Sequence, residues 1–311
     1  MADDENGTGR ITRPTSDEVI SALRSSGWLL EQDTALTLEK NGFYVTTNKA
    51  FPDPDDPSVS REIDVFGYRQ LFRSDELSFS VGARVIVECK QSTMPYVVIG
   101  APTDARETGD PRKEQVFRFP SVETGRVDLG DGRARLKTTP AREYLGLDKL
   151  PGNPWETDFI GNQLTRLERK KAWLADNRGI FTSLVYPLAK AVTYQRSQSN
   201  RSSYVMHRPG QDWATIDFYY PLIVTSAPLF FVDATAANIE AVEVPWVRVK
   251  REIKSAKVDG LFRIDVVTSE SLARYLDKRV NDFCSAVTEV VESDPQRFVT
   301  HQDHDYRSRG A

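Results

Sequence analysis

The chain has 311 residues, of which 39% are hydrophobic and 10% aromatic, and its formal net charge is −4. This is ordinary globular usage, and the net charge argues against a protein whose whole surface binds nucleic acid. The two cysteines, Cys89 and Cys284, argue against a disulfide framework or a zinc site. The chain has no apolar run of about 18 residues and its N-terminus is acidic, so we expect no membrane span, no secretory signal and a cytoplasmic location.

Residues 1–13 are polar and are expected to form a disordered tail. A short helix is predicted to begin at Thr15 or Ser16, because either hydroxyl can cap it and acidic residues follow in its first turn. Its expected apolar stripe is Val19, Ile20 and Leu23.

A second helix is predicted over 28–41, ending at Asn41-Gly42, and a strand over 43–47. Phe51 to Ser60 is rich in proline and aspartate and is expected to be a loop. Its acids, Asp53, Asp55 and Asp56, lack the glycine and terminal glutamate of a calcium loop. We therefore expect them to lie in a solvated turn.

Two strand-like runs, 62–72 and 77–90, are separated by Arg73-Ser74-Asp75-Glu76, which is a loop length typical of a hairpin. The stretch 101–160 is dense in glycine, proline and charge, and it is expected to be a surface insertion. Helical spacing of leucines predicts helices within 163–194. Ile216 to Val232 is expected to form a strand, a turn at Ser226-Ala227-Pro228 and a strand that returns beside the first. Two more strands are expected over 242–249 and 262–267, and a final helix over 269–292.

No internal repeat or long linker is present, so one elaborated α/β domain over 14–300 is the simplest organisation, followed by a tail over 301–311. Within it we expect a core over 28–100, the insertion over 101–160 and the remaining core with its extensions over 161–300.

The predicted hairpin places charge where a core strand is expected. Side chains alternate along a strand, so Glu88 and Lys90 share one face, and Asp64 shares a face with Glu62 opposite Ile63 and Val65. If the arms pair, Asp64 lies beside Glu88 and Lys90. Buried carboxylates are costly unless a partner compensates them, and a divalent cation takes them as oxygen ligands. The alternative is a structural acid–lysine pair on a solvated hairpin face.

Glu31 adds a third acid. At helical spacing it lies on the apolar face of the second predicted helix with Trp28, Ala35 and Leu38. Such a glutamate either extends along the edge of the helix to solvent or points into a polar site beneath it.

Three stretches carry a family resemblance: Leu30-Glu31 with Ala35, Leu36 and Leu38, then Glu62-Ile63-Asp64-Val65, then Val87-Glu88-Cys89-Lys90. In order and spacing they resemble the PD-(D/E)XK nuclease superfamily, particularly its Mrr-like restriction endonuclease branch. The resemblance implies a restriction-endonuclease-like α-β-β-β-α-β core, with a mixed central sheet flanked by helices and elaborated by the insertion and by extra C-terminal strands and a helix. The helices within 163–194 and the strand from Ile216 would complete that core.

The resemblance also implies roles for individual residues. Asp64, Glu88, the Cys89 main-chain carbonyl and Glu31 would bind Mg²⁺, for which Mn²⁺ can substitute. Lys90 would position or activate the attacking water.

Gln91, which directly follows the motif, would assist. The implied activity is hydrolysis of nucleic acid, with DNA favoured over RNA, by an endonuclease of restriction or antiviral defence. A homodimer and a protein partner are both compatible with it. The alternative is a catalytically inactive relative that binds nucleic acid or a protein.

Basic segments elsewhere in the chain are candidates for contacts to phosphates. Residues 161–201 hold eight Lys or Arg against two acids, and 246–263 hold six against two. The alternative for each segment is a solvated face. The candidate nucleic-acid-binding residues are Arg166, Arg169, Lys170, Lys171, Lys250 and Arg251.

Overall fold

The computed structural model describes residues 13–103, 115–116, 121–130, 133–205 and 213–299. The expected tails over 1–13 and 301–311 lie outside these ranges, apart from Arg13. Within the described ranges, no helix is both long and apolar enough to cross a membrane.

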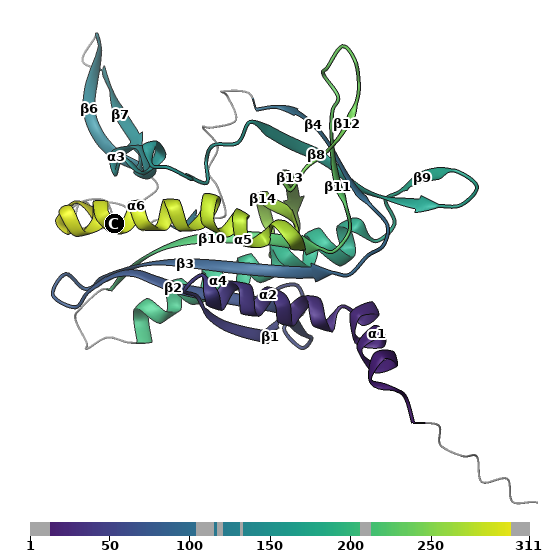
Figure 1. Cartoon of the computed structure of the whole chain (residues 1–311). Coiled ribbons are helices and arrows are strands. Elements are labelled where there is room, and N and C mark those ends of the chain that lie inside the picture. The colour runs from purple at the N-terminus through teal and green to yellow at the C-terminus, as the bar shows by residue number, and fades with distance from the viewer. Residues whose placement is uncertain (1–12, 104–114, 117–120, 131–132, 206–212, 300–311) are drawn as a thin grey trace, which may run out of the picture.

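A large mixed sheet organises the fold, and helices lie on both sides of it (Figure 1). Its strands follow the order β1 (Tyr44–Pro52), β2 (Ser60–Ser74), β3 (Phe79–Lys90), β10 (Ala214–Thr225), β14 (Asp259–Thr268), β13 (Trp246–Lys254), β8 (Phe159–Arg169), β4 (Tyr96–Pro102), β11 (Leu229–Asp233) and β12 (Ala241–Glu243), with β5 (Gln115–Val116) beside β10 and β9 (Trp173–Asp176) beside β8. The expected α/β class is confirmed. A separate two-stranded ribbon consists of β6 (Ser121–Gly130) and β7 (Arg133–Pro140).

The first strands form an antiparallel meander, β1-β2-β3, and β10 then lies parallel to β3. The predicted hairpin is confirmed, with Ser74 opposite Phe79 at its closed end. Helix α2 (Trp28–Lys40) precedes the meander and α4 (Tyr186–Val205) precedes β10. The chain therefore runs through a helix, three antiparallel strands, a second helix and a parallel strand, with β4 to β9 between β3 and α4.

Each face of the sheet has its own hydrophobic core. Leu38 of α2 packs on the face that carries Val85 and Val87, together with α6 (Asp282–Ser293). Leu188 of α4 packs on the opposite face, which carries Ile86. Because β3 is apolar on both faces, it is a central strand buried from both sides.

The N-terminal helix α1 (Ser16–Ser26) begins as expected, with Thr15 and Glu18 forming a reciprocal capping box. Its expected apolar stripe does not reach the core, since none of its residues is buried and Val19 and Ile20 are exposed. Hydrophobic spacing alone does not say whether a partner surface exists.

The helices expected within 163–194 are partly wrong. Residues 159–176 form the β8–β9 hairpin, and helical structure begins at 181 with a π-helical turn that continues into α4. Leu164 has helical spacing to Leu167, but the segment pairs with β4 instead. Gly161 allows that approach, because a Cβ there would lie 2.1 Å from Val98 Cγ1.

Two other expectations are corrected by the tertiary structure. Strand β11 does not return beside β10, since it pairs with β4 and β12. The aspartate-rich loop is not simply a solvated turn, because Asp53 is buried and its Oδ2 lies 2.8 Å from Lys190 Nζ and 2.8 Å from Arg61 Nε. The remaining helices are α3 (Ala141–Tyr144) and α5 (Leu272–Tyr275), which leads through a π-helical turn into α6.

Candidate active site

The sheet divides between β2 and β3 at the residues that the sequence singles out. The β2–β3 pairing ends at Val65 opposite Val87. Strand β2 nevertheless continues beside β1 as far as Ser60, and β3 continues beside β10 as far as Lys90. The two pairs of strands therefore separate at Asp64 and Glu88.

Asp64 lies in this gap. Its Oδ2 accepts a hydrogen bond of 2.7 Å from the backbone N–H of Cys89, so a side chain replaces the strand partner that β3 loses here. Burial raises the pKa of Asp64, whereas the Cys89 hydrogen bond and the charge of Lys90 oppose that rise.

The regular alternation of β2 is interrupted beside Asp64. Ile63 packs in the core on the α4 side, whereas Val65 packs in the core on the α2 side, so the expectation that they share a face was wrong. The cause lies on β1, where Asn48 has a left-handed backbone with φ 49° between the pairs Thr47–Val65 and Lys49–Ile63. Asn48 is therefore opposite Asp64, and its backbone shifts the pleat.

Glu88 and Lys90 form an ion pair on the same strand, with 2.8 Å between Glu88 Oε1 and Lys90 Nζ. Burial raises the pKa of Glu88 to about 7, and the negative charge of Asp64 contributes to the rise. Burial opposes a charge on Lys90, but the Glu88 carboxylate outweighs it and raises the pKa of Lys90. The pair thus keeps the amine protonated beside a carboxylate that ionises near neutral pH.

Glu31 faces the same group of side chains from the first turn of α2. Burial raises its pKa, the charge of Asp64 adds to the rise, and a hydrogen bond from the Asn48 side chain lowers it. Asn48 was not among the residues predicted from the sequence. Its signal was an asparagine in a strand-like run, because asparagine tolerates the left-handed region better than most residues.

The start of α2 lies against the end of β3. Gly27, with φ 91°, joins α1 to α2, and a Cβ added there would lie 3.3 Å from Gln91 Cβ. A glycine at this position allows both the turn and the close approach. Gln91 itself is exposed at the rim of the group.

The donor set suits a hard divalent cation. The charge of Asp64 raises the pKa of both Glu31 and Glu88, and the charge of Glu31 adds to the rise for Glu88, so repulsion among carboxylates is built into the arrangement. Carboxylate and carbonyl oxygens are the ligands of Mg²⁺, and only the carbonyl of Cys89 is suited to this role. Its thiol is buried, contacts Thr34, and has a raised pKa because of burial. Across the described residues, no group of three or more His, Cys, Asp and Glu side chains is arranged to hold a metal ion, so the set rests on two strand carboxylates and a carbonyl, with Glu31 near them.

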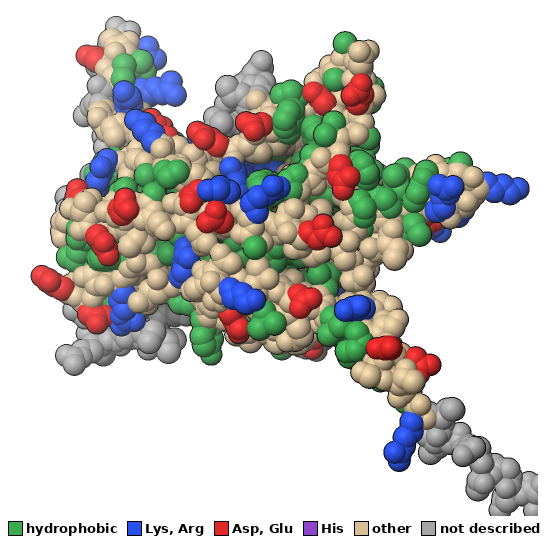
Figure 2. All heavy atoms as spheres, in the orientation of Figure 1, with side chains coloured by type: hydrophobic (Ala, Val, Ile, Leu, Met, Phe, Trp, Pro, Cys, Tyr) green, Lys and Arg blue, Asp and Glu red, His purple; other side chains and the backbone are tan. Residues whose placement is uncertain are grey.

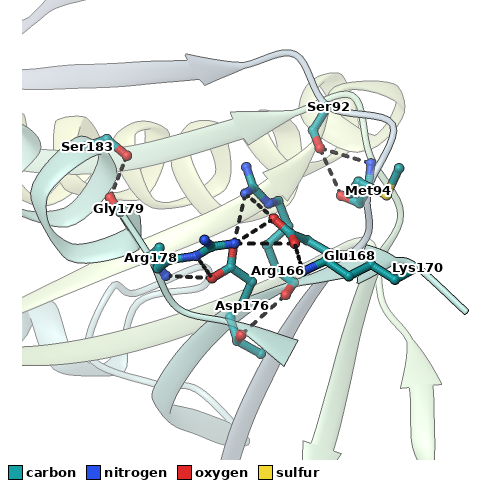
Figure 3. A network of polar contacts seen from close by, with 10 residues as sticks. Ser92, Met94, Arg166, Glu168, Lys170, Asp176, Arg178, Gly179 and Ser183 are labelled. Carbon is teal, nitrogen blue, oxygen red and sulfur yellow. Dashed lines mark hydrogen bonds and ion pairs between the residues drawn. The ribbon is translucent and has the colours of Figure 1, made fainter. Parts of the chain in front are cut away.

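The basic candidates of 161–201 lie on the β8–β9 hairpin, and Figure 3 shows two of them, Arg166 and Lys170. The guanidinium of Arg166 lies 3.3 Å from a carboxylate oxygen of Glu168 and 3.3 Å from one of Asp176, so its charge is largely neutralised within the hairpin. Lys170 Nζ lies 3.8 Å from Glu168, while Arg169 stacks its guanidinium on Trp173.

This hairpin adjoins the candidate site. The backbone N–H of Leu167 donates a hydrogen bond to the Pro95 carbonyl. Arg166 of the hairpin and Lys90 of the site both lie near Tyr96, and the charge of each lowers the pKa of its hydroxyl. Lys250 and Arg251 lie elsewhere, on β13, where burial lowers the pKa of each and Arg251 donates to the Asn162 carbonyl. These two are poor candidates for contact with phosphates.

Comparison of the chain with protein-family models, curated proteins and solved structures finds no match.

Proposed function

We propose that this chain is a Mg²⁺-dependent nuclease that hydrolyses phosphodiester bonds of DNA. The observation that carries the proposal is the meeting of the Asp64 carboxylate with the Glu88–Lys90 pair where β2 leaves β3. The succession α2-β1-β2-β3-α4-β10, with β10 parallel to β3, supports the resemblance to the PD-(D/E)XK superfamily.

The proposed role of each residue follows from the chemistry of its side chain or carbonyl. Asp64, Glu88 and the Cys89 carbonyl would hold Mg²⁺, with Glu31 available to the ion or its water. A divalent ion held there would lower the pKa of a water molecule and neutralise charge on the scissile phosphate. Lys90 is half-buried and kept protonated by Glu88, so it can donate a hydrogen bond to the attacking water or to the phosphate.

The base of the β8–β9 hairpin, at Arg166 and Leu167, adjoins the site, which supports nucleic acid as the substrate. Toward the tip of the hairpin, Arg169 and Lys171 are exposed, and Trp173 presents an exposed ring that can stack on a base. DNA is favoured over RNA by the family resemblance. Cleavage of both strands would require two copies or two successive encounters.

A second function is a protein of the same fold that binds nucleic acid without cleaving it. The absence, among the described residues, of a group of three side chains arranged to hold a metal favours that alternative. The two functions differ in one observable, which is Mg²⁺-dependent strand cleavage.

The test is incubation of the purified protein with supercoiled plasmid and with RNA, in Mg²⁺ and in EDTA. We expect nicking or linearisation of plasmid in Mg²⁺ and none in EDTA. Asp64→Asn should abolish it, whereas Asp75→Asn, an exposed acid at the closed end of the same hairpin, should not. Equal activity of Asp64→Asn and wild type would exclude the site, and binding without cleavage would favour the second function.

A further inference from the structure

A pocket lies in the half of the sheet away from β1, and the proposed catalytic chemistry does not use it. It is bounded by the segment just before β8, by the hairpin of β11 and β12, and by the beginning of β13. Its lining includes Asp265 of β14, which pairs with Leu222 of β10, and Leu222 in turn pairs with Val87 of β3. The pocket therefore begins two strands away from β3, and none of the proposed catalytic residues lines it.

The pocket has the size and the apolar walls of a ligand site. Its volume of about 590 Å³ lies within the range of about 300–1,000 Å³ that small-molecule pockets occupy. Phe159 and Phe231 both line it, with 5.1 Å between their ring centroids. Phe159 is 42% exposed and Val242, also in the lining, is 55% exposed. Apolar side chains thus remain in contact with water here, and the apolar part of a ligand would cover them.

The most deeply buried charges of the pocket already have partners within the protein. Arg248 Nε and Nη2 each donate a 2.7 Å hydrogen bond to the Asp265 carboxylate, and the Tyr275 hydroxyl donates one of 2.6 Å. Burial raises the pKa of Asp265, but the charges of Arg248 and Arg279 outweigh this and lower the pKa. Asp265 therefore stays ionised without a ligand, and the buried pair is a fixed part of the pocket.

Four further carboxylates border the pocket. Glu156, Asp158 and Glu240 are exposed, Asp233 is half-buried, and none of the four forms an ion pair with a base in the described part of the chain. The hydroxyl and the backbone N–H of Thr235 donate hydrogen bonds of 2.7 and 2.8 Å to Asp233 Oδ1, and they lower its pKa. Figure 2 shows acidic and hydrophobic side chains mixed on the projection that β11 and β12 form at the upper right.

The charge of the lining favours a cation. Five carboxylates and two guanidinium groups line the pocket, so its charge is negative at neutral pH. An anion would be repelled, and a neutral apolar ligand would displace water from carboxylates without giving them a partner. A cationic group avoids both costs. The faces of aromatic rings such as those of Phe159 and Phe231 also attract cations.

We propose that this pocket binds a small organic cation, that is, an amine or a guanidinium carried on an aromatic or aliphatic body. The exposed carboxylates bind the charged group, and the phenylalanine and valine side chains contact the body. The volume of the pocket corresponds to one small molecule. This binding is independent of the proposed function, because no residue of the pocket takes part in the proposed cleavage.

Ligand-observed NMR titration tests the proposal with four probes. 4-Phenylbutylamine has the cationic group and the aromatic ring, 4-phenylbutanol replaces the amine by a neutral hydroxyl, 4-phenylbutyrate replaces it by a carboxylate, and butylamine lacks the ring. The pocket variant carries Glu156→Gln and Glu240→Gln. A matched control carries Glu39→Gln and Glu289→Gln, which removes two exposed carboxylates from α2 and α6. Circular dichroism checks that both variants fold.

We expect 4-phenylbutylamine to bind wild type at least about tenfold more tightly than either 4-phenylbutanol or butylamine, and 4-phenylbutyrate not to bind. The pocket variant should raise the Kd for 4-phenylbutylamine at least about threefold over the control, because it loses two charge contacts.

Three results would overturn the proposal. The first is no binding of 4-phenylbutylamine, and the second is equal Kd values for the amine and the alcohol. The third is equal Kd values for the amine in the pocket variant and the control, which would place the cation elsewhere. All three are read in the absence of DNA, so they do not depend on whether the protein cleaves it.

Discussion

The backbone N–H of Cys89 donates a 2.7 Å hydrogen bond to the Asp64 carboxylate, across the point where their strands separate. Cys89 lies between Glu88 and Lys90 in the chain, so this bond fixes the distance between Asp64 and the ion pair on β3. The groups that would bind a metal and its substrate are thus positioned by rigid strands and by one charge-assisted hydrogen bond.

Lys90→Met should remove the amine while keeping most of the apolar stem. We expect single-turnover cleavage of plasmid to slow by about 10²- to 10⁴-fold, the range for a positioned proton donor or acceptor. Lys40→Met, an exposed lysine on α2, should cleave at the wild-type rate. Wild-type cleavage by Lys90→Met would show that the amine has no part in the reaction.

Glu88→Gln should change how stability depends on pH. The folded-state pKa of Glu88 is raised from 4.5 to about 7, so the folded protein keeps a proton that the unfolded chain loses. In EDTA the contribution of Glu88 to stability is therefore present below about pH 4.5 and is lost as the pH rises to about 7.

Denaturant unfolding at pH 5 and pH 8 measures this effect. On going from pH 5 to pH 8, the free energy of unfolding of Glu88→Gln should rise relative to that of wild type by up to about 3 kcal/mol. Other titrating groups largely cancel in this difference. A wild-type-to-variant difference that is the same at both pH values would show that the Glu88 pKa is not raised.

Binding of Mg²⁺ should release protons. At pH 7 Glu88 is about half protonated, and a metal ion binds only its ionised form. Calorimetric titration at pH 7 in two buffers of different ionisation enthalpy should give a release of at least about half a proton per ion. The apparent affinity should rise from pH 6 to pH 8, and an affinity that does not change over that range would contradict the assignment of Glu88.

Two substitutions of Asn48 distinguish the effect of its left-handed backbone from the effect of its side-chain hydrogen bond. Asn48→Ala should cost about 1–2 kcal/mol of unfolding free energy because alanine resists the left-handed region, whereas Asn48→Gly should be close to wild type. Both variants lose the hydrogen bond that lowers the pKa of Glu31, so both should shift the pH–rate profile of cleavage upward. If only the destabilised alanine variant changes in activity, Asn48 acts on the fold alone.

The local features of the site were open to prediction from sequence because they rest on short-range patterns. Pairing of the two hairpin arms predicted that Asp64 lies beside Glu88 and Lys90, and helix periodicity placed Glu31 on the apolar face of α2, either at its edge or above a polar site. The interruption of the alternation of β2 beside Asp64 was not predictable in this way. It lies opposite the left-handed backbone of Asn48 in a different strand, which no periodicity in β2 reports.

The larger errors came from contacts between distant segments. Leu164 and Leu167 have helical spacing, yet strand pairing with β4 decides their structure. Asp53 was expected in solvent because its neighbours are polar, but Lys190, far along the chain, buries and pairs with it. In each case the deciding partner is distant in sequence, and intrinsic propensity yields to tertiary packing.

The central claim is that Asp64 and Glu88 share one divalent ion. Anomalous diffraction from crystals of the protein soaked in Mn²⁺ tests it most directly, because the ion is located without reference to activity. We predict a single strong peak within bonding distance of a carboxylate oxygen of Asp64 and of Glu88, which is lost in Asp64→Asn. Ordered side chains of Asp64 and Glu88 with no peak between them at saturating Mn²⁺ would contradict the claim.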